Sequence, residues 1–281
     1  MSEVVFVNMR NDDGVIYPSY KEEYYRLVEL SGFRTIELNE IEYDKDYYVI
    51  ISPRNGNTNA HFDHIQAQGR KCTLVYWALE WPTYRDGVLE GAKLEPYWDL
   101  VLVSDKHLLS VLKKENPEHN IKYIIFGGHK DFGGEHKEEM WDFVTLAYAY
   151  GTRAHKMEIL ASNGYSFAPS QISCWGEEKK KALSRARWGL CLHQFGVSFL
   201  NVQRLTLFAS WKLPIISDYC VNPYPYKIFP DGLVHFDPRN TICGNRSVMR
   251  EAAEYNHYLV TQLHTFKSEV DKITSPKWYH D

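Results

Sequence analysis

One stretch of the sequence, from Trp188 to Asp218, constrains the fold more than any other. It reads as an apolar strand at 188–192, a polar loop, a segment with helical spacing at 204–212, and a second apolar strand at 213–216. Two buried strands joined by a helix form a parallel crossover connection. Ligands of open parallel sheets bind beyond the carboxyl ends of the strands. The stretch therefore predicts a ligand site where these two strands end.

Polar residues follow both strands and open the helix between them. The candidates for ligand contact are His193, Gln194, Asn201, Arg204, Ser217 and Asp218. Their side chains suit the hydroxyl groups of a sugar or ribose, and the guanidinium of Arg204 suits a phosphate. An arginine at a helix start is unfavourable with the helix dipole, which favours a functional role for it. The alternatives are a structural histidine at 193 and a turn residue at 218.

A second candidate for anion binding lies at Gly151, Thr152 and Arg153. These residues follow an apolar segment at 143–148 and open a helix that extends to residue 160. Unpaired N–H groups at a helix start, together with a glycine and an arginine, suit a phosphate or diphosphate. The alternative is ordinary turn chemistry, since many α/β units have a glycine turn at this position.

The composition indicates a globular protein that is not a dedicated nucleic-acid binder. The 281 residues are 44% apolar and 24% charged, with a formal net charge of -4. Strong nucleic-acid binders are usually basic overall, although the net charge does not exclude a local basic groove. The five cysteines form no Cys-x-x-Cys pair, which favours structural thiols in a reducing compartment. Since we find no basic leader and no apolar run of about 18 residues, we expect a cytoplasmic protein.

Strands and helices alternate along the whole chain. Expected strands lie at 4–8, 35–38, 47–51, 73–79, 100–103, 122–126, 143–148, 188–192, 213–216 and 233–236. This alternation predicts an α/β protein with two tandem Rossmann-like domains, each built on a parallel sheet. A glycine-rich segment at 127–140 resembles a linker between them, and 247–273 has the spacing of a long helix. We expect domains at 1–137 and 138–250, and a C-terminal helical segment at 251–281.

In the first half, candidate residues lie on loops at the predicted carboxyl edge of the sheet. Glu80 follows the strand at 73–79 and precedes Trp81, an apolar neighbour that raises the pKa of a carboxyl and suits a general base. Asp13, Arg10 and Arg54 lie on loops at the same edge and could hold a second substrate. The alternative for Glu80 is a surface acid.

Four further features of the sequence do not predict a site. Asp44-Lys-Asp46 precedes an apolar strand, whereas a metal-binding Asp-x-Asp should follow one, and His61 with His64 lacks a third ligand. We therefore expect no metal. The glycines at 127–134 lack the ending of a phosphate loop. The basic run at 179–181 fits a helix face exposed to solvent. The alternative is a surface that contacts a nucleic acid.

Taken together, several motifs resemble the GT-B glycosyltransferases. They are Tyr150-Gly-Thr-Arg153, Trp175-Gly-Glu-Glu178, Leu190-Cys-Leu-His-Gln194, and Arg204 to Ala209 followed by Leu213-Pro-Ile-Ile-Ser-Asp218. They look most like the donor half of the group-1-type and spore-coat-type enzymes, which phages also carry. In the first half, 74–80, 97–104 and 122–128 look like the matching acceptor half.

The resemblance implies a metal-independent transfer of a sugar, hexosyl or pentosyl, from a nucleotide-sugar to a hydroxyl acceptor. It implies a donor, a UDP-sugar by expectation, held in the C-terminal domain by 151–153 and the residues that follow the strand at 188–192. Glu80 or Asp13 would deprotonate the acceptor, and Arg10, Arg54 and Trp81 would position it. By analogy with compact phage enzymes, double-stranded DNA with a hydroxymethylated base is the acceptor considered. A C-terminal helix would pack back on the N-terminal domain.

The helix at 204–209 departs from the family, because many relatives have a glutamate there and this chain has no acid in that segment. This departure keeps a second hypothesis open, a non-catalytic protein that binds a nucleotide or nucleotide-sugar. A sugar-nucleotide epimerase of the same fold is a third. A serine hydrolase is disfavoured, since no Gly-x-Ser-x-Gly occurs.

Overall fold

A computed structural model describes most of the chain, which is divided into two compact units. The described residues are 2–9, 20–52, 69–79, 83–85, 88–90, 92–147, 149, 151–169, 176–192, 202–217, 233–235, 246–275 and 278. The first unit comprises Met1–Ile125 and Phe266–Asp281, and the second comprises Phe126–Thr265. The chain therefore leaves the first unit after Ile125 and returns to it at Phe266, whereas the sequence suggested divisions after 137 and 250.

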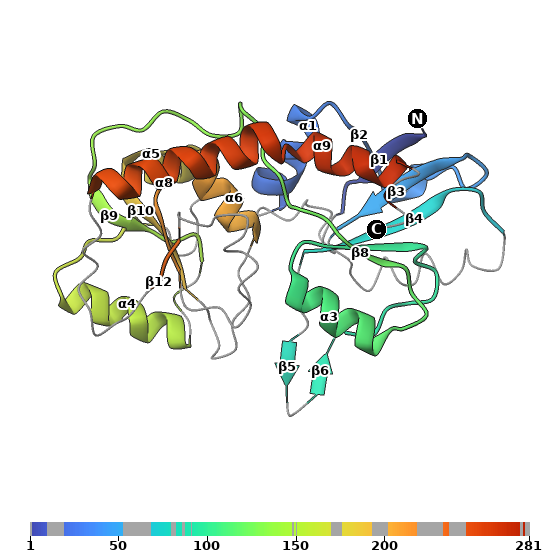
Figure 1. The fold of residues 1–281 in the computed structure, drawn as a ribbon, viewed down its shortest axis with the longest axis horizontal. Helices are drawn as coiled ribbons and strands as arrows, with labels where there is room; N and C mark the ends of the chain where they lie inside the picture. Colours follow the sequence, from blue (N-terminus) through green and yellow to red (C-terminus); the bar gives the residue numbers. More distant parts are fainter. Residues whose placement is uncertain are drawn as a thin grey trace. The chain divides into compact units, whose positions relative to one another are not determined.

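The first unit is built on a six-stranded sheet in which all neighbouring strands are parallel. The order across the sheet is β2-β1-β3-β4-β7-β8 (Figure 1). The strands are β1 (Glu3–Val7), β2 (Arg34–Ile36), β3 (Tyr47–Ile51), β4 (Thr73–Ala78), β7 (Leu100–Val103) and β8 (Ile121–Tyr123). The parallel α/β architecture expected from the sequence is confirmed. The strand order reverses between β1 and β3, which is where such sheets place ligands.

Alternate residues of the first sheet face two different layers of helix. Phe6 and Trp77 pack on Phe266, with ring centroids 5.9 and 5.4 Å from it. Phe266 begins α9 (Phe266–Asp271), and the same face receives η1 (Tyr20–Tyr25) and α1 (Arg26–Leu30). On the other face, Leu108 of α3 (Lys106–Glu115) joins the core cluster of β1, β3, β4 and β7. Asp105 caps α3, because its carboxylate accepts the backbone N–H groups of His107 and Leu108.

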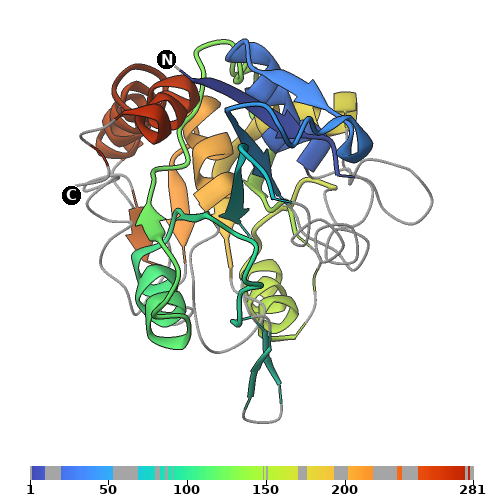
Figure 2. The ribbon, with the colours of Figure 1, turned by 90° about the vertical axis from the view of Figure 1, so that its right-hand side faces the viewer.

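A short antiparallel ribbon was not expected from the sequence. It consists of β5 (Thr83–Arg85) and β6 (Val88–Glu90), and it stands apart from the six-stranded sheet in both views (Figures 1 and 2).

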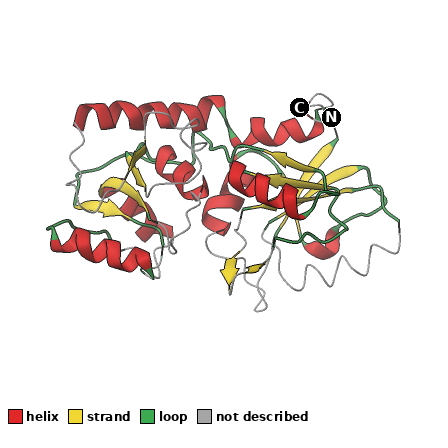
Figure 3. Ribbon diagram, turned by 60° about the horizontal axis from the view of Figure 1, so that its bottom comes forward, coloured by secondary structure: helices red, strands yellow, loops and turns green. Residues whose placement is uncertain are grey.

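The second unit has a four-stranded parallel sheet in the order β12-β11-β10-β9. The strands are β9 (Trp141–Val144), β10 (Ala186–Cys191), β11 (Ile215–Ser217) and β12 (Leu233–His235). Helices lie on both sides of these strands (Figure 3). They are α4 (Thr152–Ser162), α5 (Gly176–Arg185), α6 (Val202–Ser210) and α8 (Arg246–Tyr258). The predicted crossover of two parallel strands and a helix is therefore β10-α6-β11.

The helix expected at 247–273 is divided into several pieces. After α8 come η4 (Leu259–Leu263), then α9, then η5 (Lys272–Thr274). The division falls where Thr265 forms a parallel bridge with Gly128. A residue paired in a bridge cannot also continue an α-helix, so α8 and α9 are separate elements that belong to different units.

Helix α6 is buried from Leu205 to its end and packs very closely on its neighbours. Every residue from Leu205 to Ser210 is buried. A Cβ added at Gly189 of β10 would lie 2.5 Å from the ring of Phe208, and one at Gly133 would lie 1.8 Å from the carbonyl oxygen of Ser210. The segment that resembles a linker is therefore packed on the end of α6, and its glycines permit that approach.

Two further expectations can be compared with the structure. Lys179, expected on a solvated face, is only 3% exposed, because it shares a face of α5 with Ala182 and Leu183. Cys72 and Cys191 are both buried free thiols. Among the described residues, no helix has the length and apolar character needed to cross a membrane.

Replacing Gly189 by alanine tests the contact between β10 and α6. We expect Gly189→Ala to lower the free energy of unfolding by about 1–3 kcal/mol, because the new methyl group overlaps the Phe208 ring. Urea denaturation measures the loss. The double variant with Phe208→Leu should recover part of it, since the smaller side chain makes room. Strictly additive losses would contradict the contact.

Phe266→Ala tests the return of the chain to the first unit. The ring is fully buried against Phe6, Tyr24 and Trp77, so its removal should lower the free energy of unfolding by about 3–5 kcal/mol. Tyr255→Ala is the matched control, because that side chain is 43% exposed. Equal losses for the two variants in urea denaturation would show that residue 266 is not part of the core.

Candidate functional site

The carboxyl end of β10 is the point where several predicted side chains meet. The Nε of Arg153 donates a hydrogen bond of 2.9 Å to the carbonyl oxygen of Leu192, the residue after the strand. The hydroxyl of Ser217 donates to the carbonyl oxygen of Cys191 at 3.2 Å. Nη1 of Arg204 lies 3.9 Å from Sγ of Cys191. Residues from α4, α6 and β11 thus converge on Cys191, the last residue of β10, and on Leu192, which follows it.

Gly151 directs the chain into α4 and so positions Arg153. It has φ 57° and ψ -139°, a conformation that residues with a side chain rarely adopt. The helix therefore begins at Thr152, immediately after this glycine. Arg153 is only 8% exposed, and its bond to the Leu192 carbonyl fixes the direction of the guanidinium. Gly151, Thr152 and Arg153 occupy the helix start that the sequence predicts.

This arrangement can bind an anion. The start of α4 presents backbone N–H groups and the positive end of the helix dipole. The guanidinium groups of Arg153 and Arg204 add two full positive charges around the same strand end. Phosphate oxygens match both kinds of donor. The chemical capacity of this edge is therefore to hold a phosphate or diphosphate against the end of β10.

Thr145 is a candidate that the sequence reasoning missed. It follows β9 directly and is fully buried, and its hydroxyl has no hydrogen-bond partner among the described residues. A buried hydroxyl without a partner is uncommon, and here it lies at the edge where Arg153 and Ser217 also lie. The sequence did not single it out, because Thr145 falls inside the strand expected at 143–148, whereas β9 ends at Val144.

In the first unit, Tyr25 marks the corresponding edge. Its hydroxyl accepts the N–H of Met9 at 2.7 Å, and it lies 2.8 Å from the Val7 carbonyl oxygen and 3.2 Å from that of Ser52. It therefore joins the ends of β1 and β3, where the strand order reverses. The Ser52 side chain is also buried, and its hydroxyl has no partner within the described part of the chain.

Many of the predicted residues fall outside the described residues. They are Arg10, Asp13, Arg54, Glu80 and Trp81 in the first half, and His193, Gln194, Asn201 and Asp218 in the second. His61 and His64 are outside as well. Of the predicted donor-side residues, the structure describes Gly151, Thr152, Arg153, Arg204 and Ser217.

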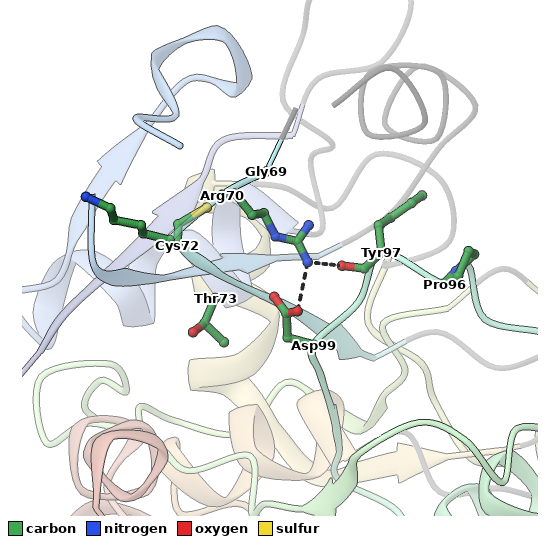
Figure 4. A pocket seen from close by; sticks show the side chains of 8 residues that line it. Gly69, Arg70, Cys72, Thr73, Pro96, Tyr97 and Asp99 are labelled. Atoms are coloured by element: carbon green, nitrogen blue, oxygen red, sulfur yellow. Dashed lines mark hydrogen bonds and ion pairs between the residues drawn. The ribbon is translucent and has the colours of Figure 1, made fainter. Parts of the chain in front are cut away.

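The first unit has a cavity of about 430 Å³, which lies away from the edge where β1 and β3 end (Figure 4). It is next to the beginnings of β4 and β7. Its arginine, Arg70, is already paired with Asp99 at 2.8 Å and with the carbonyl oxygen of Tyr97 at 2.6 Å. Burial raises the pKa of the neighbouring Cys72 thiol, which disfavours a nucleophilic thiolate. The cavity contains no predicted site residue, and Asp99 already compensates the charge of Arg70.

Across the described ranges, no group of three or more His, Cys, Asp or Glu side chains is arranged to hold a metal ion. Asp44 and Asp46 lie in the turn before β3.

The chain is similar to solved glycosyltransferase structures. AviGT4, a glycosyltransferase involved in avilamycin A biosynthesis, matches with a TM-score of 0.56 and 10% identity over 100% of this chain and 97% of its own. TarM from S. aureus, solved with fondaparinux, alpha-GlcNAc-glycerol and UDP, matches with a TM-score of 0.59 and 10% identity over 87% of this chain. No protein-family model and no curated protein matches the sequence.

These similarities define the fold as that of the GT-B glycosyltransferases, with two units that each contain a parallel sheet. The fold class expected from the sequence is therefore confirmed. The chain spans 57% of the TarM chain and 63% of the matched chain of the GtfA/B complex.

Removing the Arg153 side chain tests its place in the site. We expect Arg153→Ala to lower the free energy of unfolding by about 1–3 kcal/mol, because the bond to the Leu192 carbonyl is lost. Thermal and urea denaturation measure this loss. His155→Ala, on the same helix with a side chain 76% exposed, should have no measurable effect. An equally small effect at both positions would argue against the contact.

Proposed function

We propose that this chain transfers a sugar, hexosyl or pentosyl, from a nucleotide-sugar to a hydroxyl acceptor without a metal ion. The observation that carries the proposal is the convergence of Arg153 and Arg204 on the end of β10. The GT-B fold supports it, since AviGT4 and TarM, which share this fold, are glycosyltransferases.

The two arginines and the start of α4 would stabilise the leaving diphosphate. When the bond between sugar and phosphate breaks, negative charge develops on the phosphate oxygens. Guanidinium groups and backbone N–H groups that are already in place stabilise this charge without rearrangement. They would supply the electrostatic contribution that a divalent cation makes in metal-dependent phosphate chemistry.

Residues after β10 and β11 would hold the remainder of the donor. Ser217 lies at the strand edge and donates to Cys191, and His193, Gln194, Asn201 and Asp218 follow the same strands in sequence. Thr145 joins this set through its buried, unpartnered hydroxyl. We propose a UDP-sugar as the donor, a choice supported by the presence of UDP in the TarM structure.

The acceptor side of the proposal belongs to the first unit. Glu80 or Asp13 would remove the proton from the acceptor hydroxyl, and Arg10, Arg54 and Trp81 would position it. Tyr25 and Ser52 lie at the sheet edge where β1 and β3 end. As acceptor we propose a hydroxymethylated base in phage DNA, on the analogy of compact phage enzymes.

One observation favours a second candidate, a nucleotide-sugar binding protein without transferase activity. The half-buried start of α6 has Arg204 in place of an acid, and the following residues from Leu205 to Ala209 are buried and uncharged. No carboxylate in that stretch can hold the donor ribose or sugar.

Turnover of nucleotide-sugars tests the proposal. We expect UDP release that depends on an acceptor, and we expect Arg204→Gln to lower kcat/KM by about 10²–10³-fold, because a charge that stabilises the leaving group is lost. The matched control is Lys181→Gln, which removes one positive charge from an exposed position of α5 in the same unit.

The outcomes separate the two candidates. Nucleotide-sugar binding without UDP release, over a panel of sugars with hydroxymethylated DNA, unmodified DNA and simple alcohols, would support the binding protein. Absence of both binding and release would overturn the site. Transfer to hydroxymethylated DNA alone would support the DNA acceptor, and transfer only to small alcohols would exclude it.

A further inference from the structure

A second cavity of the C-terminal unit lies at the edge of the sheet where the strands begin. Its volume is about 300 Å³, and its lining includes Arg187 and Trp188 of β10, Pro214 before β11, and Met249 and Arg250 of α8. Arg187 and Cys191 are four residues apart along β10, or about 13 Å at the usual rise of a strand. The cavity is thus separate from the candidate donor site at the end of the same strand.

The acidic side chains of this cavity are already paired. Glu254 forms an ion pair of 2.9 Å with Lys212, and Glu139 lies 3.8 Å from the imidazole of His136. Three permanent cations, Arg187, Lys212 and Arg250, thus line a cavity that contains two carboxylates. The cavity has an excess of positive charge.

Arg187 has no polar partner among the residues that the structure describes. Its guanidinium lies 4.3 Å from the centroid of the Trp188 ring, and its Nε is buried without an acceptor. A buried N–H without an acceptor is costly, and in native proteins an unseen ion or ligand often explains it. Arg250 is exposed, and it forms no hydrogen bond or ion pair with a described residue. Two arginines are therefore available to an anion.

The backbone conformation of Lys212 places a third positive charge beside the cavity. The N–H groups of Lys212 and Leu213 donate to the carbonyls of Ala209 and Phe208, which is the Schellman arrangement at a helix end. Glycine usually occupies this position, and Lys212 has φ 54°, the single positive value recorded for a non-glycine residue among those described. The strained lysine places its side chain beside the cavity, where it neutralises Glu254.

We propose that this cavity binds a phosphate group, free or as a small monoester, between Arg187 and Arg250. Two guanidinium groups match the several oxygens of one phosphate and can each donate two hydrogen bonds. In a monoester, the organic group would lie against the apolar wall formed by Pro214 and Met249. The volume is at the lower end of the range for ligand pockets, which restricts the ligand to a small molecule.

Isothermal titration of the full chain with inorganic phosphate and with phenyl phosphate tests the proposal. The titrations use the Arg204→Gln variant as background. This change should weaken phosphate binding at the end of β10, which would otherwise contribute to the measured heat. We expect saturable binding that Arg187→Gln and Arg250→Gln each weaken by about tenfold or more. Lys181→Gln should leave it unchanged. Tighter binding of phenyl phosphate would identify a monoester as the ligand, and equal binding would identify free phosphate.

Two variants keep the test decisive if Arg187→Gln fails to fold. Arg250 is exposed, so its replacement should not disturb the core. Lys212→Gly should keep or raise the melting temperature, because glycine accepts the positive φ, yet it should weaken phosphate binding by leaving Glu254 unpaired. Absence of saturable binding, or binding that neither Arg250→Gln nor Lys212→Gly changes, would overturn the proposal.

Discussion

The second unit depends on one close contact, that between helix α6 and strand β10. Because residue 189 has no side chain, the ring of Phe208 lies where a Cβ would otherwise be. The helix can therefore sit directly on the sheet, with Leu205 to Ser210 all buried. This packing fixes both ends of the helix. Arg204 lies at the end of β10, and Lys212 lies beside the beginning of the same strand, so one rigid element sets the place of both cationic clusters.

The parallel sheet explains why residues distant in sequence meet at the end of β10. Parallel strands all end at one edge, so the segments after β9, β10 and β11 must come together there. Backbone carbonyls at the strand end still need donors, and Arg153 and Ser217 supply them for Leu192 and Cys191. The same side chains that complete the fold thus bring positive charge and a hydroxyl to the edge. In the proposed donor site, Arg153 would therefore serve both the stability of the fold and the binding of the ligand.

Local patterns in the sequence predict much of the fold but little of the packing. The apolar runs at 47–51 and 100–103 coincide with β3 and β7, and the Asp105 cap is visible in the sequence because a capping side chain acts on its own neighbours. The burial of Lys179 and the tight approach of Gly133 to Ser210 depend on partners far along the chain. The cluster around Arg187 also escaped prediction, since its members come from β10, α8 and the turn after α6, and they share no motif.

The return of the chain at Phe266 has a consequence for synthesis on the ribosome. Residues up to Ile125 emerge first, but the ring that packs on Phe6 and Trp77 is added only after the whole second unit has been made. Domains usually fold in the order in which they are translated. Here the N-terminal unit, although first to appear, must wait with an incomplete apolar face, while the C-terminal unit can complete its own core as soon as Thr265 is available.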